Sequence, residues 1–435
     1  MNSITKSYPE RKIQGRSRGT LATSKEKKKR CMNNRICITG VGVVSSIGIG
    51  KEEFLSSLKA GKSGIDEIKE FDTGFSRSKK GGRVRNFNPR DFIAPSKIRR
   101  LDRASQFAIA ASKLALADAR FSVTSENASR VGVVLGSGFC GLSSSEEFHR
   151  AQVLKGFLDL NPMLFPNTVP NAPASYVSIE LGIQGVNSTL VQSFCTAEAA
   201  ILFACDQIQA KRADLILAGG VDELSEFLFR GFSDLHLLAT DKGYGERSSP
   251  YDRMRNGIIL GEGAGILTLE SEEHARWRGA RILATISGHS LVGSSHQGEV
   301  KDLCRSIQLA LPKEQEIRID YISGAGNSSK EVDSLEAKAI DYLFPNKSHP
   351  IPVSSVKGML GEAMAMGGIR MVANLLAMEF SFIPPTINYQ FPDPECDLSY
   401  ITHQSKDHEI HTLLHLGISP KECYSTFLIR REWNP

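Results

Sequence analysis

A pattern of buried strands alternating with helices starts twice along this 435-residue chain, and this restart limits the fold more than any other feature. In the first part, apolar stretches that often end in glycines alternate with helix-like stretches. After Ala280 the alternation begins again. Such alternation predicts an α/β protein with largely parallel sheets, and the chain is too long for one ordinary core. We therefore predict two similar α/β halves, residues 34–279 and 280–435, with a reaction centre at the seam between them.

The element boundaries follow from apolar periodicity and from glycine positions. The first half is predicted to have strands at 35–42, 131–135, 213–220 and 263–270, and helices at 107–119 and 197–211. The second half is predicted to have strands at 281–287, 319–323 and 351–355, helices at 300–311, 331–343 and 367–380, and two strands around a loop within 411–430.

Composition excludes several classes of protein. Hydrophobic residues make up 41% of the chain and charged residues 23%, as in a soluble globular protein. No apolar stretch reaches the 18 residues that a membrane span needs. The eight cysteines form no CxxC pair, which argues against a zinc site and a dense disulfide framework and favours a reducing cytoplasm.

Most of the positive charge lies in one segment. Residues 1–33 carry ten Lys or Arg and two acids, a net +8, which leaves the rest of the chain near −3. This segment has no apolar stripe and is predicted to be a disordered tail. It is a candidate for contact with nucleic acid or an anionic surface, or for a targeting segment; alternatively, Met32 is the true start. Nothing in the body indicates nucleic-acid binding.

One glycine motif is a weak signal. The stretch Gly136–Gly141 fits G-x-G-x-x-G after a strand, but no clear strand ending in an acidic residue follows about twenty residues later. The first strand lacks the motif altogether. We therefore do not expect a nicotinamide or flavin site.

Cys195 is the leading nucleophile candidate. An apolar, β-branched stretch stops at this thiol and an alanine-rich helix begins behind it. The free N–H groups and the dipole of a helix N-terminus tend to lower the pKa of such a thiol and to activate it. The alternative is a small buried hydrophobic residue.

Several ordered segments together resemble the β-ketoacyl-acyl carrier protein synthases, in the elongating branch of the thiolase-fold superfamily. These segments run from about residue 35 to residue 430: ITGVGVVS at 38–45, LGSG at 135–138, AGGVD at 218–222, PYDRMRNGIILGEGAG at 250–265 and PPTIN at 384–388. The resemblance implies a thiolase fold, with two βαβαβαββ-type halves in a five-layer α-β-α-β-α block, usually a dimer.

The resemblance also implies a chemistry. A cysteine takes an acyl chain from acyl carrier protein as a thioester, and a decarboxylated malonyl unit then attacks it. Two histidines hold the malonyl thioester and a lysine supports one of them. Carried over, the nucleophile falls on Cys195 and the lysine on Lys357, while Asp333 and Glu336 match helix positions.

The histidines do not carry over. Ala325 and Glu362 occupy their places, and Pro420 stands in the loop that the family uses for its oxyanion hole, where it removes a backbone donor. Losing one such donor typically costs roughly 3–4 kcal/mol in the transition state. We expect Glu362 either to pair with Lys357 as a carboxylate or, if protonated, to donate a hydrogen bond. His415 lies ahead of the changed loop as a candidate imidazole; the alternative is a surface or core histidine.

Three outcomes stay open. In the first, Cys195 is acylated and an altered set of side chains still catalyses the condensation. In the second, the chain is a non-condensing, chain-length-factor-like partner of an active ketosynthase. In the third, the acyl group passes from Cys195 to another acceptor without decarboxylation. The leading hypothesis is an acyltransferase of a fatty-acid or polyketide-type pathway that accepts chains on Cys195, with ordinary condensation doubtful. Its site comprises Cys195, Lys357, Glu362 and His415.

The implied partners are acyl carrier protein and a second subunit, in a homodimer or in a heterodimer with a paralogous ketosynthase. No metal or organic cofactor is implied, since the phosphopantetheine arrives on the carrier. Carriers are acidic, so Arg99, Arg100 and Arg103 are candidates for a docking surface; the alternative is a solvated helix face. Loops at 165–172 and 227–237 are expected to line the acyl pocket.

Overall fold

The structure is a computed structural model that describes residues 35–294, 299–312, 317–345 and 348–432. The predicted basic tail at residues 1–33, which includes Met32, lies outside these residues. Among the described residues, no helix is long and apolar enough to cross a membrane.

The first half is built on a sheet with the strand order β1-β8-β7-β5-β6. Its main elements are β1 (Ile36–Ser45), α4 (Arg103–Asp118), β5 (Val131–Gly136), α5 (Leu142–Lys155), α6 (Ala172–Leu181), β6 (Asn187–Leu190), α7 (Thr196–Gln209), β7 (Leu215–Asp222), α8 (Glu226–Asp234) and β8 (Gly263–Ser271). Shorter elements are β2 (Gly48–Ile49), α2 (Lys51–Ala60), β3 (Asp66–Glu67), β4 (Lys80–Gly81), α3 (Pro95–Ile98) and α9 (Glu272–Trp277).

The second half repeats this plan with the strand order β9-β15-β14-β10-β11. Its elements are β9 (Ala284–Gly293), α10 (Val300–Ala310), β10 (Tyr321–Ser323), α11 (Lys330–Leu343), β11 (Val353–Ser354), α12 (Lys357–Leu360), α13 (Met366–Glu379), β12 (Phe382–Ile383), β13 (Lys406–Asp407), β14 (Thr412–Ser419) and β15 (Cys423–Arg431). The strands of the two halves join into one continuous sheet, because Ile36–Ile38 of β1 pair antiparallel with Ala284–Ile286 of β9.

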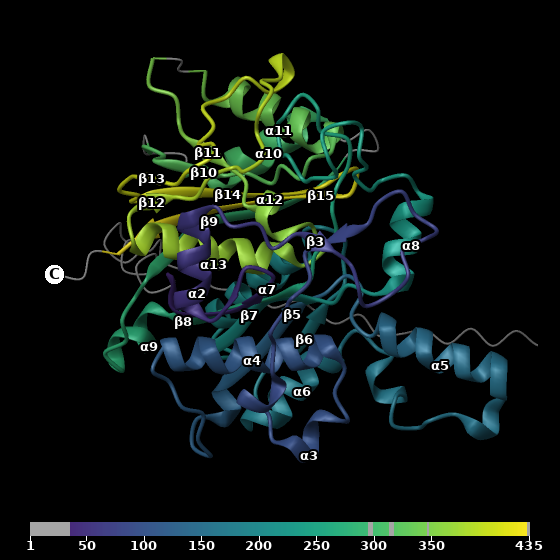
Figure 1. Cartoon of the computed structure of the whole chain (residues 1–435). Coiled ribbons are helices and arrows are strands. Elements are labelled where there is room, and N and C mark those ends of the chain that lie inside the picture. Colours follow the sequence, from purple (N-terminus) through teal and green to yellow (C-terminus); the bar gives the residue numbers. More distant parts are fainter. Residues whose placement is uncertain (1–34, 295–298, 313–316, 346–347, 433–435) are drawn as a thin grey trace, which may run out of the picture.

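The layers alternate between helices and sheets (Figure 1). Helices α4 and α6 cover the outer face of the first sheet, and α10 with α11 covers the outer face of the second. Helices α7 and α13 lie between the sheets and contact strands of both. The five-layer arrangement predicted from the resemblance is therefore confirmed.

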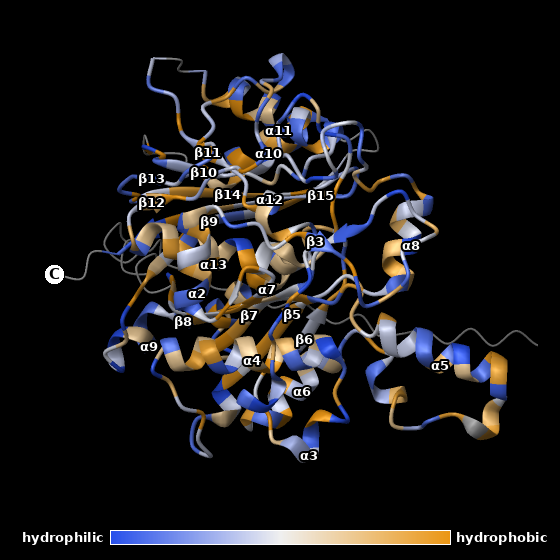
Figure 2. Ribbon diagram, viewed as in Figure 1, coloured by the Kyte–Doolittle hydropathy of each residue, from blue (hydrophilic) through white to orange (hydrophobic). Residues whose placement is uncertain are grey.

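Helix α13 shows why its sequence belongs in the middle layer. Every residue from Met366 to Met378 is buried, so the helix has no face for solvent. A helix that is apolar all round packs between two other layers. Gly265 of β8 also lets the start of α13 approach closely, because a Cβ at this position would overlap the backbone of Gly368 and Ile369. Figure 2 shows the apolar residues of this layer enclosed between the two sheets.

The predicted elements are present, with three differences. The sheets are mixed rather than largely parallel, because β8 runs antiparallel to β1 and β7, and β15 runs antiparallel to β14 and β9. Helix α4 begins four residues early, because the Asp102 side chain accepts a hydrogen bond from the Ser105 amide and caps it. The strand before Cys195 ends at Leu190, so four residues separate it from the thiol.

Helix α5 and the segment after it project from the rest of the molecule (Figure 1). Their apolar side chains are exposed to an unusual degree: Val153, Leu154, Phe157, Leu158 and Phe165. A cavity of about 580 Å³ lies against this projection, lined by α5 and Phe227. Exposed apolar surface of this kind on a single chain marks an interaction surface.

The base of this projection is held by a buried carboxylate. The Ser143 amide donates to Glu223 over 3.1 Å, and burial together with the charge of Asp102 raises the pKa of Glu223 to about 7. Because the Glu223 pKa is higher in the folded state than its ordinary value of 4.5, the folded protein loses stability as the pH rises from about 4.5 to about 7.

We expect Glu223→Gln to stabilise the protein at alkaline pH, because the amide keeps an acceptor for Ser143 without a buried charge. The gain in unfolding free energy should grow from about 1 kcal/mol or less near pH 5 to about 3 kcal/mol near pH 8. Urea unfolding at both pH values measures this gain. The exposed Glu147→Gln is the control and should change little; an equal gain in both variants would contradict the prediction.

Candidate functional site

Cys195 is the N-cap residue of α7, at the seam between the halves. The turn before it is fixed by the Thr196 hydroxyl, which donates to the Leu190 carbonyl over 2.8 Å. The Cys195 thiol donates to the carbonyl oxygen of Cys423 over 3.7 Å, and the Ser425 hydroxyl donates to the sulfur over 3.9 Å. The side chain is fully buried.

The expectation of a lowered thiol pKa is wrong. The hydrogen bond with Cys423, burial, and the nearby charge of Glu198 raise the pKa of Cys195 well above its ordinary value. The position at a helix N-terminus is the one that the sequence indicated, but desolvation and a negative neighbour oppose the helix dipole. At neutral pH this sulfur is therefore a thiol.

A second group of buried polar side chains lies one helical turn further along α7. His415 Nε2 is 3.1 Å from Glu198 Oε1, and its Nδ1 is 3.0 Å from the Asn374 amide nitrogen. Arg370 Nη1 lies 3.7 Å from the same Glu198 oxygen. His415 is a fully buried core histidine held on both ring nitrogens.

The protonation states in this group follow from the contacts. Burial acts to raise the pKa of Glu198, but the hydrogen bond from His415 and the charge of Arg370 outweigh it and lower the pKa overall. Burial and the charge of Arg370 lower the pKa of His415 to about 4. The pair is therefore a carboxylate beside a neutral imidazole, with the arginine as the positive charge.

Lys357 and Glu362 form the third part of the site. Lys357 Nζ lies 2.7 Å from Glu362 Oε2, so the expected ion pair is confirmed. The side-chain amide of Asn327 donates to the same Glu362 oxygen over 2.9 Å. Glu362 Oε1 is buried and has no hydrogen-bond partner among the described residues. The charge of Lys357 also lowers the pKa of His415, which places the second and third groups near each other.

The loop around Ala325 is held by carboxylates. The Ala325 amide donates to Glu336 Oε1 over 2.6 Å, and the Gly326 amide donates to Glu336 Oε2 over 2.9 Å. The Asp333 carboxylate accepts hydrogen bonds from the backbone amides of Tyr251 and Asn327. Asp333 and Glu336 therefore fix the loop, and the Ala325 N–H is already used.

The segment after His415 forms a hairpin. Strand β14 ends at Ser419, Lys421 takes a positive φ of 63° in the turn, and β15 begins at Cys423. This hairpin brings the Cys423 carbonyl onto the Cys195 thiol. The thiol hydrogen of Cys195 is therefore already donated to a main-chain carbonyl.

Two backbone amides of the glycine loop at 136–141 already have hydrogen-bond acceptors within the protein. The Gly138 and Phe139 amides both donate to Asp222 Oδ1, over 2.9 and 3.2 Å. Backbone amides in such a loop bind a phosphate only when they are free to donate. The loop here fastens to β7 instead.

Sequence reasoning missed Arg370, Asn374, Asn327 and Cys423. Arg370 left a signal, since a charged residue within the apolar stretch 366–378 requires a buried partner. Glu198, one turn after the thiol, was also missed as a part of the site. Among the described residues no cluster of His, Cys, Asp and Glu could hold a metal ion.

Of the predicted docking arginines, Arg99 and Arg100 are exposed. Arg103 is not available, because it donates to the buried carboxylate of Glu262 over 2.7 Å and to the Val84 carbonyl. The predicted loop at 227–237 is largely helix α8, and Phe227 lines the cavity beside α5.

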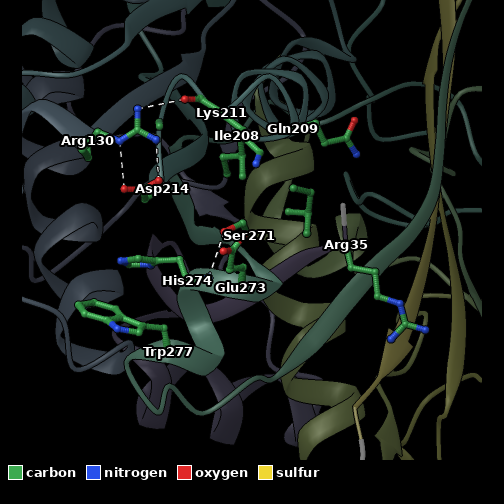
Figure 3. Close-up of a pocket in the computed structure, with 12 residues that line it drawn as sticks. Arg35, Arg130, Ile208, Gln209, Lys211, Asp214, Ser271, Glu273, His274 and Trp277 are labelled. Carbon is green, nitrogen blue, oxygen red and sulfur yellow. Dashed lines mark hydrogen bonds and ion pairs between the residues drawn. The ribbon is translucent and has the colours of Figure 1, made fainter. Parts of the chain in front are cut away.

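A pocket of about 450 Å³ lies where β1 begins and α7 ends (Figure 3). Its polar groups are largely paired, as Arg130 is with Asp214 and with the Lys211 carbonyl. None of the four predicted site residues lines this pocket or the cavity beside α5.

The sequence matches two family models that lie end to end. The β-ketoacyl synthase N-terminal domain matches residues 33–275, and the β-ketoacyl synthase C-terminal domain matches residues 284–390. The chain belongs to the β-ketoacyl synthase family. Its thiolase-like α/β fold agrees with solved ketosynthase structures.

The similarity extends over nearly all of the chain. The 3-oxoacyl-[acyl-carrier-protein] synthase 2 of Staphylococcus aureus strain COL is 33% identical over 391 residues, 87% of this chain and 94% of the relative. The enzyme of the same name from Coxiella burnetii is also 33% identical, with the same coverage. The ishigamide ketosynthase/chain length factor structure has a TM-score of 0.83 and 28% identity, and covers 92% of this chain and 100% of that one. A type II polyketide ketosynthase in complex with its acyl-carrier protein gives the same values.

Proposed function

We propose that this β-ketoacyl synthase family member acts in carrier-protein-dependent chain assembly of the fatty-acid or polyketide type, as a subunit that does not itself condense. It works beside a condensing ketosynthase. The observation that carries the proposal is the state of Cys195: fully buried, hydrogen-bonded to the Cys423 carbonyl, and with a raised pKa. A nucleophilic cysteine needs a thiolate that the incoming thioester can reach.

The charges around the thiol also disfavour decarboxylative condensation. This reaction builds negative charge on a thioester oxygen, which positioned donors must stabilise. The resemblance places the donor imidazoles at Ala325 and Glu362. The Ala325 amide is used by Glu336, and the Glu362 carboxylate neutralises Lys357 at 2.7 Å. The ionised Glu198 adds a further negative charge.

The surface supports a partner subunit. Strand β6 is the edge of its sheet, and the apolar projection of α5 lies on the same side of the molecule (Figure 1). Similar structures include a ketosynthase/chain length factor and a ketosynthase with its carrier protein. We assign the α5 projection to the partner subunit, and the exposed Arg99 and Arg100 to an acidic carrier protein.

A second candidate is acyl transfer through Cys195 without condensation. It is favoured by the position of the thiol at the start of the 14-residue helix α7, and by the Ser425 hydroxyl directed at the sulfur. In this case the acyl group would pass from the carrier to Cys195 and then to another acceptor.

The experiment that separates these functions is intact mass spectrometry after incubation with acyl-loaded and malonyl-loaded carrier protein. We expect no added acyl mass on the wild type and no β-ketoacyl product, and we expect product when a condensing ketosynthase from the same genome is added. Carbon dioxide release from malonyl carrier by this chain alone would refute the proposal. An adduct on the wild type that Cys195→Ala lacks would instead establish the second candidate.

A further inference from the structure

Two cysteines from opposite halves of the chain meet at the seam. The Cys195 sulfur lies 3.7 Å from the main-chain oxygen of Cys423. Cys195 is fully buried, whereas Cys423 is only partly buried at the tip of the β14–β15 hairpin. Both are free thiols in this structure. The contact thus joins a hidden thiol to one nearer the surface.

The backbones on both sides of this contact are held in place. Cys423 pairs with Ser419 on β14 and with Gly293 on β9. Cys195 caps α7 and its carbonyl accepts from the Ala199 amide over 2.9 Å. A disulfide needs Cβ atoms about 3.5–4.5 Å apart. The Cys195 sulfur touches the main chain of Cys423, and a side-chain hydrogen bond with Cys423 is the largest cause of the raised pKa of Cys195, so the two side chains are neighbours.

We propose that Cys195 and Cys423 form an oxidisable pair that a peroxide converts to an intramolecular disulfide. Hydrogen peroxide transfers one oxygen to the Cys423 sulfur, which gives a sulfenic acid and one water. The Cys195 sulfur then attacks the Cys423 sulfur, the S–S bond forms, and the hydroxyl leaves with the Cys195 proton as a second water. The two thiols lose two electrons and the peroxide gains them.

The order of these steps follows from exposure. Peroxide meets the partly exposed Cys423 first. Attack by Cys195 is slow, because its raised pKa leaves little thiolate. The sulfenic acid on Cys423 should therefore live long enough to be trapped by a reagent such as dimedone.

The other described cysteines are differently placed. The Cys140 sulfur donates to the Val221 carbonyl and the Cys304 sulfur to the Ala339 carbonyl. Within the part of the chain that the structure describes, Cys195 and Cys423 are the two cysteines that a thiol hydrogen bond joins. This inference does not rest on whether the chain condenses acyl groups. Oxidation should link β15 covalently to the start of α7, and the Cys195 thiol would then no longer be available for any other reaction.

The test is to treat the full chain with hydrogen peroxide and to measure its intact mass and its non-reduced peptide map. We expect a loss of two hydrogen masses, a crosslinked peptide pair that contains Cys195 and Cys423, and reversal by dithiothreitol. Cys423→Ser should abolish the crosslink, whereas the buried control Cys140→Ser should keep it. Dimedone added during oxidation should label Cys423 and lower the crosslink yield.

Two results would overturn the inference. One is oxidation of Cys423 to sulfinic acid without a crosslink to Cys195. The other is a set of crosslinks spread over several cysteine pairs at equal yield. The wild-type peptide map alone decides between these outcomes, so the inference stays testable even if a variant folds poorly.

Discussion

Replacing Lys357 by methionine is expected to lower the free energy of unfolding by roughly 3–5 kcal/mol. The Lys357 side chain is 4% exposed and that of Glu362 is 2% exposed, with 2.7 Å between the charged atoms. Removing the ammonium group leaves a buried carboxylate whose other oxygen has no hydrogen-bond partner among the described residues. The Asn327 amide, 2.9 Å away, would be the main remaining donor. Urea unfolding followed by circular dichroism measures the change.

Two further variants make this result specific. The double variant Lys357→Met with Glu362→Leu removes both charges and should recover most of the loss, as replacing a whole buried ion pair often does. Lys97→Met removes the exposed lysine of a pair with Glu180, which keeps Lys113 as a second partner, and should cost less than about 1 kcal/mol. If Lys357→Met costs no more than Lys97→Met, the pair does not hold the site together, and a role for Lys357 in chemistry regains weight.

The fold was largely predictable because strand and helix periodicity depends on burial, and burial follows local sequence. The restart after Ala280 predicted the second half, and the largely apolar stretch at 367–380 matches helix α13. What failed was strand direction and the strand end before Cys195. Antiparallel pairing of β8 and β15 depends on long-range packing, which periodicity does not report.

The catalytic roles of Cys195, Lys357, Glu362 and His415 stay predictions, whereas the protonation state of the thiol was predicted wrongly. All four side chains are buried. The raised pKa of Cys195 was missed because it depends on Cys423 and Glu198, and the contact with Cys423 spans 228 positions. The balance between desolvation and a helix dipole is set by such neighbours, and sequence spacing does not reveal them.

Arg370→Met is the second change with a large expected effect, again a loss of roughly 3–5 kcal/mol of unfolding free energy. Arg370 is 1% exposed and its Nη2 donates to three backbone carbonyls, over distances from 2.7 to 3.1 Å. Its Nη1 lies 3.7 Å from Glu198. Methionine fills similar space but leaves these carbonyls without this donor and the carboxylate without its positive neighbour.

A readout beyond stability distinguishes the electrostatic role of Arg370 from packing. Its charge helps to lower the pKa of His415 to about 4, so the His415 pKa should rise in Arg370→Met, as measured by NMR titration of the imidazole. Adding Glu198→Gln should recover part of the stability and reverse that rise, because the favourable carboxylate is gone. Arg150→Met, at an exposed pair with Glu146, should change neither quantity by much. An unchanged His415 pKa in Arg370→Met would show that the arginine acts through its backbone hydrogen bonds alone, and that Glu198 and His415 set their own protonation.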